Sequence, residues 1–209
     1  LLGEIHVEMA KTHSTTILEQ IDSLLKWTGK KLDEIENVLV SIGPGSFTGV
    51  RIAISVVKGL FFGRNVNFYE VNELDALGFQ GYYNLKVNLE NDEDVKIYSL
   101  IDSRKEKIYC AAYETFNGKA GRKLELVKNY EVTKLDNVIE EIIENKQDKG
   151  NNKKIYLIGD AVFNYKAKIL DKLGYFVKIF EDKNLAINTM TYVEMFLDEN
   201  LRNDNVIKK

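Results

Sequence analysis

The residues with the clearest chemical potential lie in a glycine-rich turn between a predicted strand and a predicted helix. The turn contains Gly43, Gly45 and Gly49, with Ser46 and Thr48 between them. Glycine tolerates positive φ and leaves backbone N–H groups exposed, and such groups at a helix N-terminus can hold an anion. These five residues therefore form a candidate anion-binding turn. A tight turn that binds no ligand is the alternative.

The spacing of this turn differs from that of three known functional loops. A P-loop requires Lys after its last glycine, whereas Val50 follows Gly49. A dinucleotide-binding loop requires a third glycine three residues after the second, and Thr48 stands there. A nucleophile elbow requires glycine two residues before its serine, but Pro44 holds that place before Ser46. The turn matches none of these loops.

Other residues that could do chemistry are few and scattered. The chain has two histidines, His6 and His13, and a metal site needs several converging ligands, so no metal site is predicted. Asp102 and Asp160 each follow a predicted strand and could bind magnesium or act as a base, but side chains that stabilise turns are the favoured interpretation. Cys110 is expected in the core. We predict no catalytic residue.

The glycine-rich turn must be positioned by the elements on either side of it. Residues 38–42 predict a buried strand, and residues 46–62 predict a helix with almost no polar side. One face of this helix suits a sheet, and Ile52, Val56 and Gly59 form a second apolar strip beside Ser55. A helix that is apolar nearly all round is either deeply buried or packed against another subunit.

The remaining pattern predicts an α/β protein with two similar halves. Residues 1–10 alternate like a strand, and residues 14–28 form an amphipathic helix with Leu18, Ile21 and Leu25 at helical spacing. The first half is expected to follow a β-α-β-α-β-α order and the second a β-β-β-α-β-α-β-α order. We therefore predict duplicated α/β domains at residues 1–88 and 89–209, the first lacking a hairpin that lies upstream of Leu1.

Composition limits the classes of function. The 209 residues carry a net charge of −3. The sequence has no basic stripe, so direct binding of nucleic acid is not predicted. A single cysteine excludes an intrachain disulfide and suits a reducing cytoplasm. No apolar run is long enough to cross a membrane, and no signal peptide is visible. A cytoplasmic protein without a membrane partner is expected.

One segment is similar to a known family. Residues 42–53, IGPGSFTGVRIA, followed by Gly59, closely resemble the signature of the bacterial TsaB (YeaZ) family. Residues 11–14 (KTHS), 101–105 (IDSRK) and 157–160 (LIGD) agree with the family in order along the chain. The resemblance covers nearly the whole chain and is weaker in the second half.

The resemblance implies an actin-like ATPase fold, built of two RNase H-like domains, and a non-catalytic subunit for threonylcarbamoyladenosine modification of tRNA. Its implied partners are a catalytic TsaD-like paralogue and a TsaE-like ATPase, with a homodimer when alone and tRNA reached only through the complex. It implies no cofactor in this chain by itself, and it admits ATP or ADP with Mg in the complex. The first two helices would dock the paralogue, which makes the candidate interface Leu18, Ile21, Leu25, Ile52, Ser55, Val56 and Gly59.

A second class of function stays open on sequence grounds. A free-standing ATP-dependent small-molecule kinase of the same fold would use carboxylates such as Asp102 and Asp160 at strand ends. The family's acidic first phosphate loop would lie upstream of Leu1, so we assign no nucleotide site within these residues.

Overall fold

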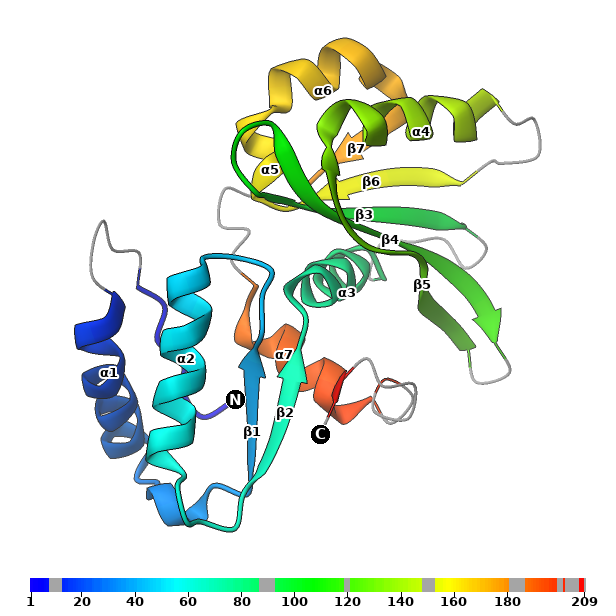
Figure 1. Cartoon of the computed structure of the whole chain (residues 1–209). Coiled ribbons are helices and arrows are strands. Elements are labelled where there is room, and N and C mark those ends of the chain that lie inside the picture. The colour runs from blue at the N-terminus through cyan, green and yellow to red at the C-terminus, as the bar shows by residue number, and fades with distance from the viewer. Residues whose placement is uncertain are drawn as a thin grey trace. The chain divides into compact units, whose positions relative to one another are not determined.

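The chain divides into two compact units. The computed structural model describes residues 1–7, 13–86, 93–118, 121–147, 153–180, 187–198, 201 and 207–208. The first unit contains Leu1–Asn72 and Tyr192–Lys209, and the second contains Glu73–Thr191. The elements of both units are labelled in Figure 1.

The first unit holds a small sheet with helices packed beside it. In chain order its elements are α1 (His13–Thr28), η1 (Leu32–Glu34), β1 (Asn37–Ser41), α2 (Phe47–Leu60), β2 (Asn67–Val71), most of α7 (Thr189–Leu197) and β8 (Ile207–Lys208). β1 and β2 are parallel, and β8 pairs antiparallel with β2. α2 packs on β1 and α1 packs beside α2 (Figure 1).

Different helices cover the two faces of β2, because successive side chains of a strand point to opposite faces. Phe68 meets Phe61, the residue after α2, with the ring centroids 6.1 Å apart. Tyr69 meets Phe196 of α7 with the centroids 5.0 Å apart. Both contacts are edge to face, a favourable arrangement for aromatic rings. They hold α2 and α7 against the sheet.

β1 confirms the strand expected before the glycine turn, but it differs in burial. Among the described strands of this sheet the order is β1-β2-β8, so β1 lies at an edge. Val38, Leu39 and Val40 are only half-buried as a result. The prediction of a buried strand at residues 38–42 is therefore wrong in burial and right in position, since one strand neighbour covers less surface than two.

The second unit is built on a mixed five-stranded sheet. Its strands follow the order β5-β4-β3-β6-β7, with β3, β4 and β5 antiparallel and with β6 and β7 parallel to β3. Its elements are α3 (Glu73–Lys86), β3 (Val95–Asp102), β4 (Lys107–Gly118), β5 (Gly121–Lys134), α4 (Leu135–Gln147), β6 (Lys154–Ile158), α5 (Asp160–Asn164), α6 (Lys166–Leu173), η2 (Gly174–Phe176) and β7 (Val177–Ile179).

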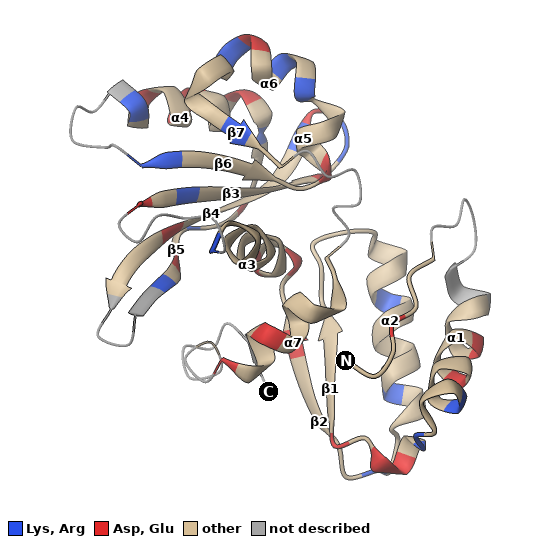
Figure 2. Ribbon diagram, turned by 180° about the vertical axis from the view of Figure 1, so that it is seen from behind, with Lys and Arg blue, Asp and Glu red and all other residues tan. Residues whose placement is uncertain are grey.

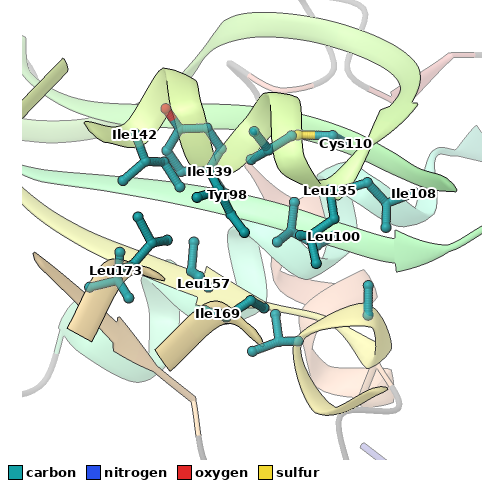
Figure 3. Close-up of a cluster of buried hydrophobic side chains, with 14 of the residues drawn as sticks. Tyr98, Leu100, Ile108, Cys110, Leu135, Ile139, Ile142, Leu157, Ile169 and Leu173 are labelled. Carbon is teal, nitrogen blue, oxygen red and sulfur yellow. The ribbon is translucent and has the colours of Figure 1, made fainter. Parts of the chain in front are cut away.

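The main core of this unit lies between the sheet and the helices α4 and α6 (Figure 3). Tyr98 and Leu100 of β3 point to this side, as do Cys110 of β4 and Leu157 of β6. α4 contributes buried apolar side chains at positions i, i+3, i+4 and i+7, which is the spacing expected of a helix with one buried stripe. Its buried residues are Leu135, Val138, Ile139 and Ile142.

α3 covers the opposite face of the same sheet, and a buried polar cluster holds it there (Figure 1). Asp75 of α3 is 2% exposed and accepts hydrogen bonds from the hydroxyls of Tyr113 at 2.7 Å and Tyr130 at 2.8 Å. A buried carboxylate is costly unless it is hydrogen-bonded, and here two hydroxyls satisfy it. Burial raises the pKa of both tyrosines, and the charge of Asp75 adds to the effect.

Three elements differ from the sequence-based expectation. Residues 1–7 form no strand, and residues 8–10 of the predicted strand lie outside the described part; an alternating pattern makes a strand only where the backbone finds a partner. The predicted order has one helix between the last two strands, but the chain forms two there, α5 and α6, divided at Tyr165, whose ψ of 18° is not helical. β8 was not predicted, since two residues carry no periodicity.

The compact units divide the chain at other places than the predicted domains 1–88 and 89–209. α3 belongs to the second unit because it packs on β3 and β4. Residues from Tyr192 belong to the first unit, where Phe196 packs on Tyr69. Each unit contains a parallel strand-helix-strand order, in β1-α2-β2 and in β6-α5-α6-β7. The duplication of the two domains stays a prediction.

Candidate functional site

The glycine-rich turn leads from β1 into α2, and its side chains serve the local backbone. Gly43 has a φ of 87°, a conformation that favours glycine, and a Cβ there would lie 3.2 Å from the Gly45 nitrogen. The Gly43–Pro44 peptide is cis. The Ser46 Oγ accepts a hydrogen bond from the Gly49 N–H at 3.3 Å, which makes Ser46 the N-cap of α2. Of the two hydroxyl side chains in the turn, Ser46 and Thr48, Ser46 is the one that caps the helix.

The glycines of the turn are not equally constrained. A Cβ at Gly45 would meet no atom within 4 Å, and one at Gly49 would make an ordinary contact of 3.5 Å with Ser46. Thr48 is exposed. The turn therefore needs glycine at residue 43 for its own conformation. Anion binding by Gly43, Gly45, Ser46, Thr48 and Gly49 stays a prediction.

α2 keeps much of its apolar surface outside the core of its unit. None of residues 47–60, all of which the structure describes, is buried. Ile52 and Val56 are half-buried, whereas Ser55 and Gly59 are exposed. A hollow of about 360 Å³, which we call the α2 hollow, is lined by Phe47, Thr48, Arg51, Ile52, Ser55 and Val56. Three of the four predicted α2 interface residues thus line one hollow.

The α2 hollow has an aromatic and cationic end. Phe47 is 69% exposed, and the guanidinium carbon of Arg51 lies 3.7 Å from the centroid of its ring. Residues four apart on a helix are neighbours, so this cation–π contact follows from the sequence spacing. It keeps a large aromatic ring and a positive charge together at the N-terminal end of the helix.

α1 presents a second and larger hollow, which we call the α1 pocket. Leu18 is 50% exposed, and Ile21 and Leu25 are half-buried. The pocket has a volume of about 700 Å³, and its apolar lining residues are Leu18, Ile21, Leu25, Leu32 and Leu60. Its other lining residues are Asp22, Lys26, Gly29, Lys30 and Lys31. The three predicted α1 interface residues therefore share one site.

Leu32 and Leu60 also line this pocket and were not among the predicted interface residues. Leu32 lies in η1, where helical spacing gives no signal, and Leu60 lies outside the second apolar strip formed by Ile52, Val56 and Gly59. Gly59, the last predicted interface residue, lines neither hollow, and a Cβ there would meet no atom within 4 Å. The structure thus brings six of the seven predicted interface residues to two hollows on the first unit.

Asp102 and Asp160 come together at the carboxyl ends of β3 and β6, but their oxygens are engaged. The Asp102 N–H donates to Asp160 Oδ1 at 2.8 Å. Asp102 accepts from the Arg104 N–H at 2.8 Å and from Asn164 Nδ2 at 2.9 Å. Burial raises the pKa of Asp160, although backbone N–H groups partly offset this. Such bonding supports the interpretation of turn-stabilising carboxylates.

Metal and nucleophile chemistry find little support in the part of the chain that the structure describes. Within it, no three His, Cys, Asp or Glu side chains converge as a metal site would require. Burial raises the pKa of Cys110 to about 12, so its thiol is protonated at neutral pH, as expected of a core cysteine. His6 is exposed. Nor does any described helix have the length and apolarity needed to cross a membrane.

Comparison with known proteins gives consistent matches. The family model of "TsaD: tRNA N6-adenosine threonylcarbamoyltransferase" matches residues 5–194. The chain is 29% identical to the "tRNA threonylcarbamoyladenosine biosynthesis protein TsaB" of Haemophilus influenzae over 47% of this chain and 39% of that protein. It is 26% identical to the TsaB of Bacillus subtilis over 56% of this chain and 48% of that protein. The chain thus spans less than half the length of these two relatives.

A solved structure shows the same fold. YeaZ from Pseudomonas aeruginosa superposes with a TM-score of 0.58 at 23% identity, over 78% of this chain and 68% of that one. The mixed α/β architecture therefore agrees with the resemblance carried by the glycine-rich turn and α2. Because the family model matches residues 5–194 of this 209-residue chain, the chain belongs to the TsaB (YeaZ) family of the TsaD superfamily, which is named for tRNA threonylcarbamoyladenosine biosynthesis.

Proposed function

We propose that this chain is a non-catalytic subunit in tRNA threonylcarbamoyladenosine biosynthesis and that it docks a catalytic TsaD-like paralogue through α1 and α2. The names of its relatives support a role of this chain in tRNA threonylcarbamoyladenosine biosynthesis. The observation that carries the docking role is the apolar helix α2, none of whose described residues is buried. A helix of this kind needs a partner surface to remove its apolar side chains from water.

The two hollows support the same surface. The α2 hollow is lined by residues of α2, and the α1 pocket by residues of α1, of the turn and η1 that follow it, and by Leu60 of α2; α1 and α2 pack side by side. Binding sites concentrate their free energy in hollows that receive large side chains from the partner. Phe47, which lines the α2 hollow, is 69% exposed and enlarges the apolar area.

The other members of the assembly belong to the proposal as well. A TsaE-like ATPase would join the pair, ATP or ADP with Mg would enter only in the complex, and tRNA would be reached through the paralogue. Without the paralogue, two copies of this chain would pair through the same helices. The hydrogen bonds of Asp102 and Asp160 to their own turns support a subunit without phosphotransfer chemistry of its own.

The direct test mixes the purified full-length protein with its TsaD-like paralogue and measures the mass of the products by size-exclusion chromatography with light scattering. We expect a heterodimer and no ATP hydrolysis by this chain alone. The absence of a heterodimer, together with ATP turnover by this chain alone, would overturn the proposal in favour of a free-standing kinase.

A substitution at α2 tests the docking surface. We expect Gly59→Arg to abolish the heterodimer without unfolding the chain, because residue 59 is exposed and its Cβ has open space. Val56→Arg should act in the same direction from within the α2 hollow. Asn65→Arg, which adds the same charge at an exposed position after the helix, is the matched control and should still bind. Unfolding of Gly59→Arg, seen by circular dichroism, would show that residue 59 belongs to the core.

A further inference from the structure

Arg51 is the one charged residue among those that line the α2 hollow, and Phe47 holds its side chain in place. The guanidinium carbon lies 3.7 Å from the centroid of the Phe47 ring, so the planar cation covers the aromatic face. A guanidinium placed in this way still has N–H donors at its edge, and their geometry suits a carboxylate. Within the described part of the chain, the Arg51 side chain takes part in no hydrogen bond or ion pair.

The charges of α2 have a single sign. Residues 47–60, all of them described, contain Arg51 and Lys58 and no Asp or Glu, and both basic side chains are exposed. Figure 2 shows basic segments and no acidic segment along α2. The ion pairs between described residues of the first unit lie in α1, at η1 and in the turn after α2, and none includes a residue of α2. The helix thus supplies no carboxylate for Arg51.

A partner that docks on α2 takes Arg51 out of water together with the hollow. Arg51 lines the hollow beside Ile52, Ser55 and Val56, which are the predicted contacts of the partner. Removal of a cation from water is costly unless an opposite charge and hydrogen-bond acceptors replace the water. Because α2 contains neither Asp nor Glu, the compensating group has to come from the partner.

We propose that the TsaD-like paralogue presents an Asp or Glu carboxylate to Arg51 when it docks on α2. This pairing rests on the proposed function and specifies the chemistry of the paralogue's contact surface. Phe47 restricts the positions of the guanidinium, so less side-chain entropy is lost on pairing than with a mobile cation. A second copy of this chain that docks through α1 offers the exposed carboxylate of Glu19, so Arg51 does not act against the homodimer.

Calorimetry with the purified full-length protein and its TsaD-like paralogue, without tRNA, measures the effect of residue 51 on affinity. We expect Arg51→Gln to weaken binding at least roughly tenfold, because the paralogue's carboxylate is left unpaired in the interface. Arg51→Glu should weaken binding further, since two carboxylates then face each other. Arg51→Lys should keep part of the affinity, because it retains the charge without the planar donors. Lys105→Glu reverses a charge at an exposed position of the second unit and, as the matched control, should bind as the parent does.

The outcomes separate this pairing from the proposed function. If the parent binds and the Arg51 variants bind equally well, the pairing is wrong and the docking proposal stands; if the parent does not bind, both are wrong. Arg51→Glu that binds no more weakly than Arg51→Gln would show that residue 51 acts through packing and not through charge. Weaker tRNA binding by the complex, with unchanged affinity for the paralogue, would assign Arg51 to a phosphate and overturn the pairing.

Thermal unfolding of each variant verifies its fold. Arg51 is exposed, so all three variants are expected to fold. If Arg51→Glu does not fold, Arg51→Gln and Arg51→Lys decide the case: equal affinities of these two variants would contradict a role of the charge.

Discussion

At the scale of single residues, two glycines of α3, Gly78 and Gly81, allow the effect of side-chain packing on stability to be distinguished from the effect of helix propensity. A Cβ at Gly78 would lie 2.7 Å from the Tyr113 ring, which is buried and held by its hydrogen bond to Asp75. A Cβ at Gly81 would make ordinary contacts of 3.4 Å. The close approach of Tyr113 to the helix thus explains the glycine at 78 and not the one at 81.

We therefore expect Gly78→Ala to lower the free energy of unfolding by about 1–3 kcal/mol through overpacking. Gly81→Ala in the same helix should raise it by about 0.5–1 kcal/mol, because alanine is the better helix former. Urea unfolding followed by circular dichroism measures both. Equal effects of the two substitutions would show that Tyr113 moves aside without cost.

The ion pairs of Glu114 contribute to the stability of the second unit, and this contribution depends on pH. Burial raises the pKa of this carboxyl, but hydrogen bonds and charges from Lys153 and Lys96 outweigh burial and lower it overall. A carboxyl with a lowered pKa in the folded state adds stability above its unfolded pKa, and this contribution disappears as the pH falls through the folded pKa. The ion pairs of Glu114 are thus a source of acid sensitivity.

Substitution of this residue tests the linkage. We expect Glu114→Gln to be less stable than the parent at neutral pH and to lose less stability on acidification, because the variant has no carboxyl to protonate. Unfolding in urea across about pH 7 to about pH 3 measures the difference. Parallel pH profiles of the two proteins would contradict this assignment.

At the scale of elements, α2 depends on its cap. Ser46→Ala removes the hydrogen bond to the Gly49 N–H and should lower the free energy of unfolding by about 1 kcal/mol. Thr48→Ala, two residues further and exposed, should change it much less. Thermal unfolding of the two variants provides the comparison. A larger loss in Thr48→Ala would mean that Thr48 supports the turn in place of Ser46.

Most elements were predictable because their signals are local. The periods of α1 and α2, the turn glycines and the strands that flank the turn all appear in the sequence and agree with the structure within a few residues. The elements that differ depend on distant partners. Residues 1–7 alternate like a strand and form none, whereas β8 exists only because β2 pairs with it.

At the scale of the whole molecule, contacts redistribute segments that are continuous in sequence. The predicted domains meet between residues 88 and 89, whereas the compact units place α3 with the sheet of the second unit and Phe196 with Tyr69 of the first. Neither of these two contacts can be predicted from the order of the elements along the chain. The family could nevertheless be identified from the segment at residues 42–53 and Gly59, and the family model agrees over residues 5–194.

The sequence by itself determined the strand, the glycine turn and the apolar helix, because periodicity and turn chemistry act over a few neighbouring residues. Together with the family resemblance it also led to the prediction of one helix-borne interface formed by Leu18, Ile21, Leu25, Ile52, Ser55, Val56 and Gly59. Only the tertiary structure decided that all of these residues except Gly59 line two hollows and that Leu32 and Leu60 complete one of them. The physical reason is that a hollow is shaped by residues from separate elements, whose meeting depends on packing.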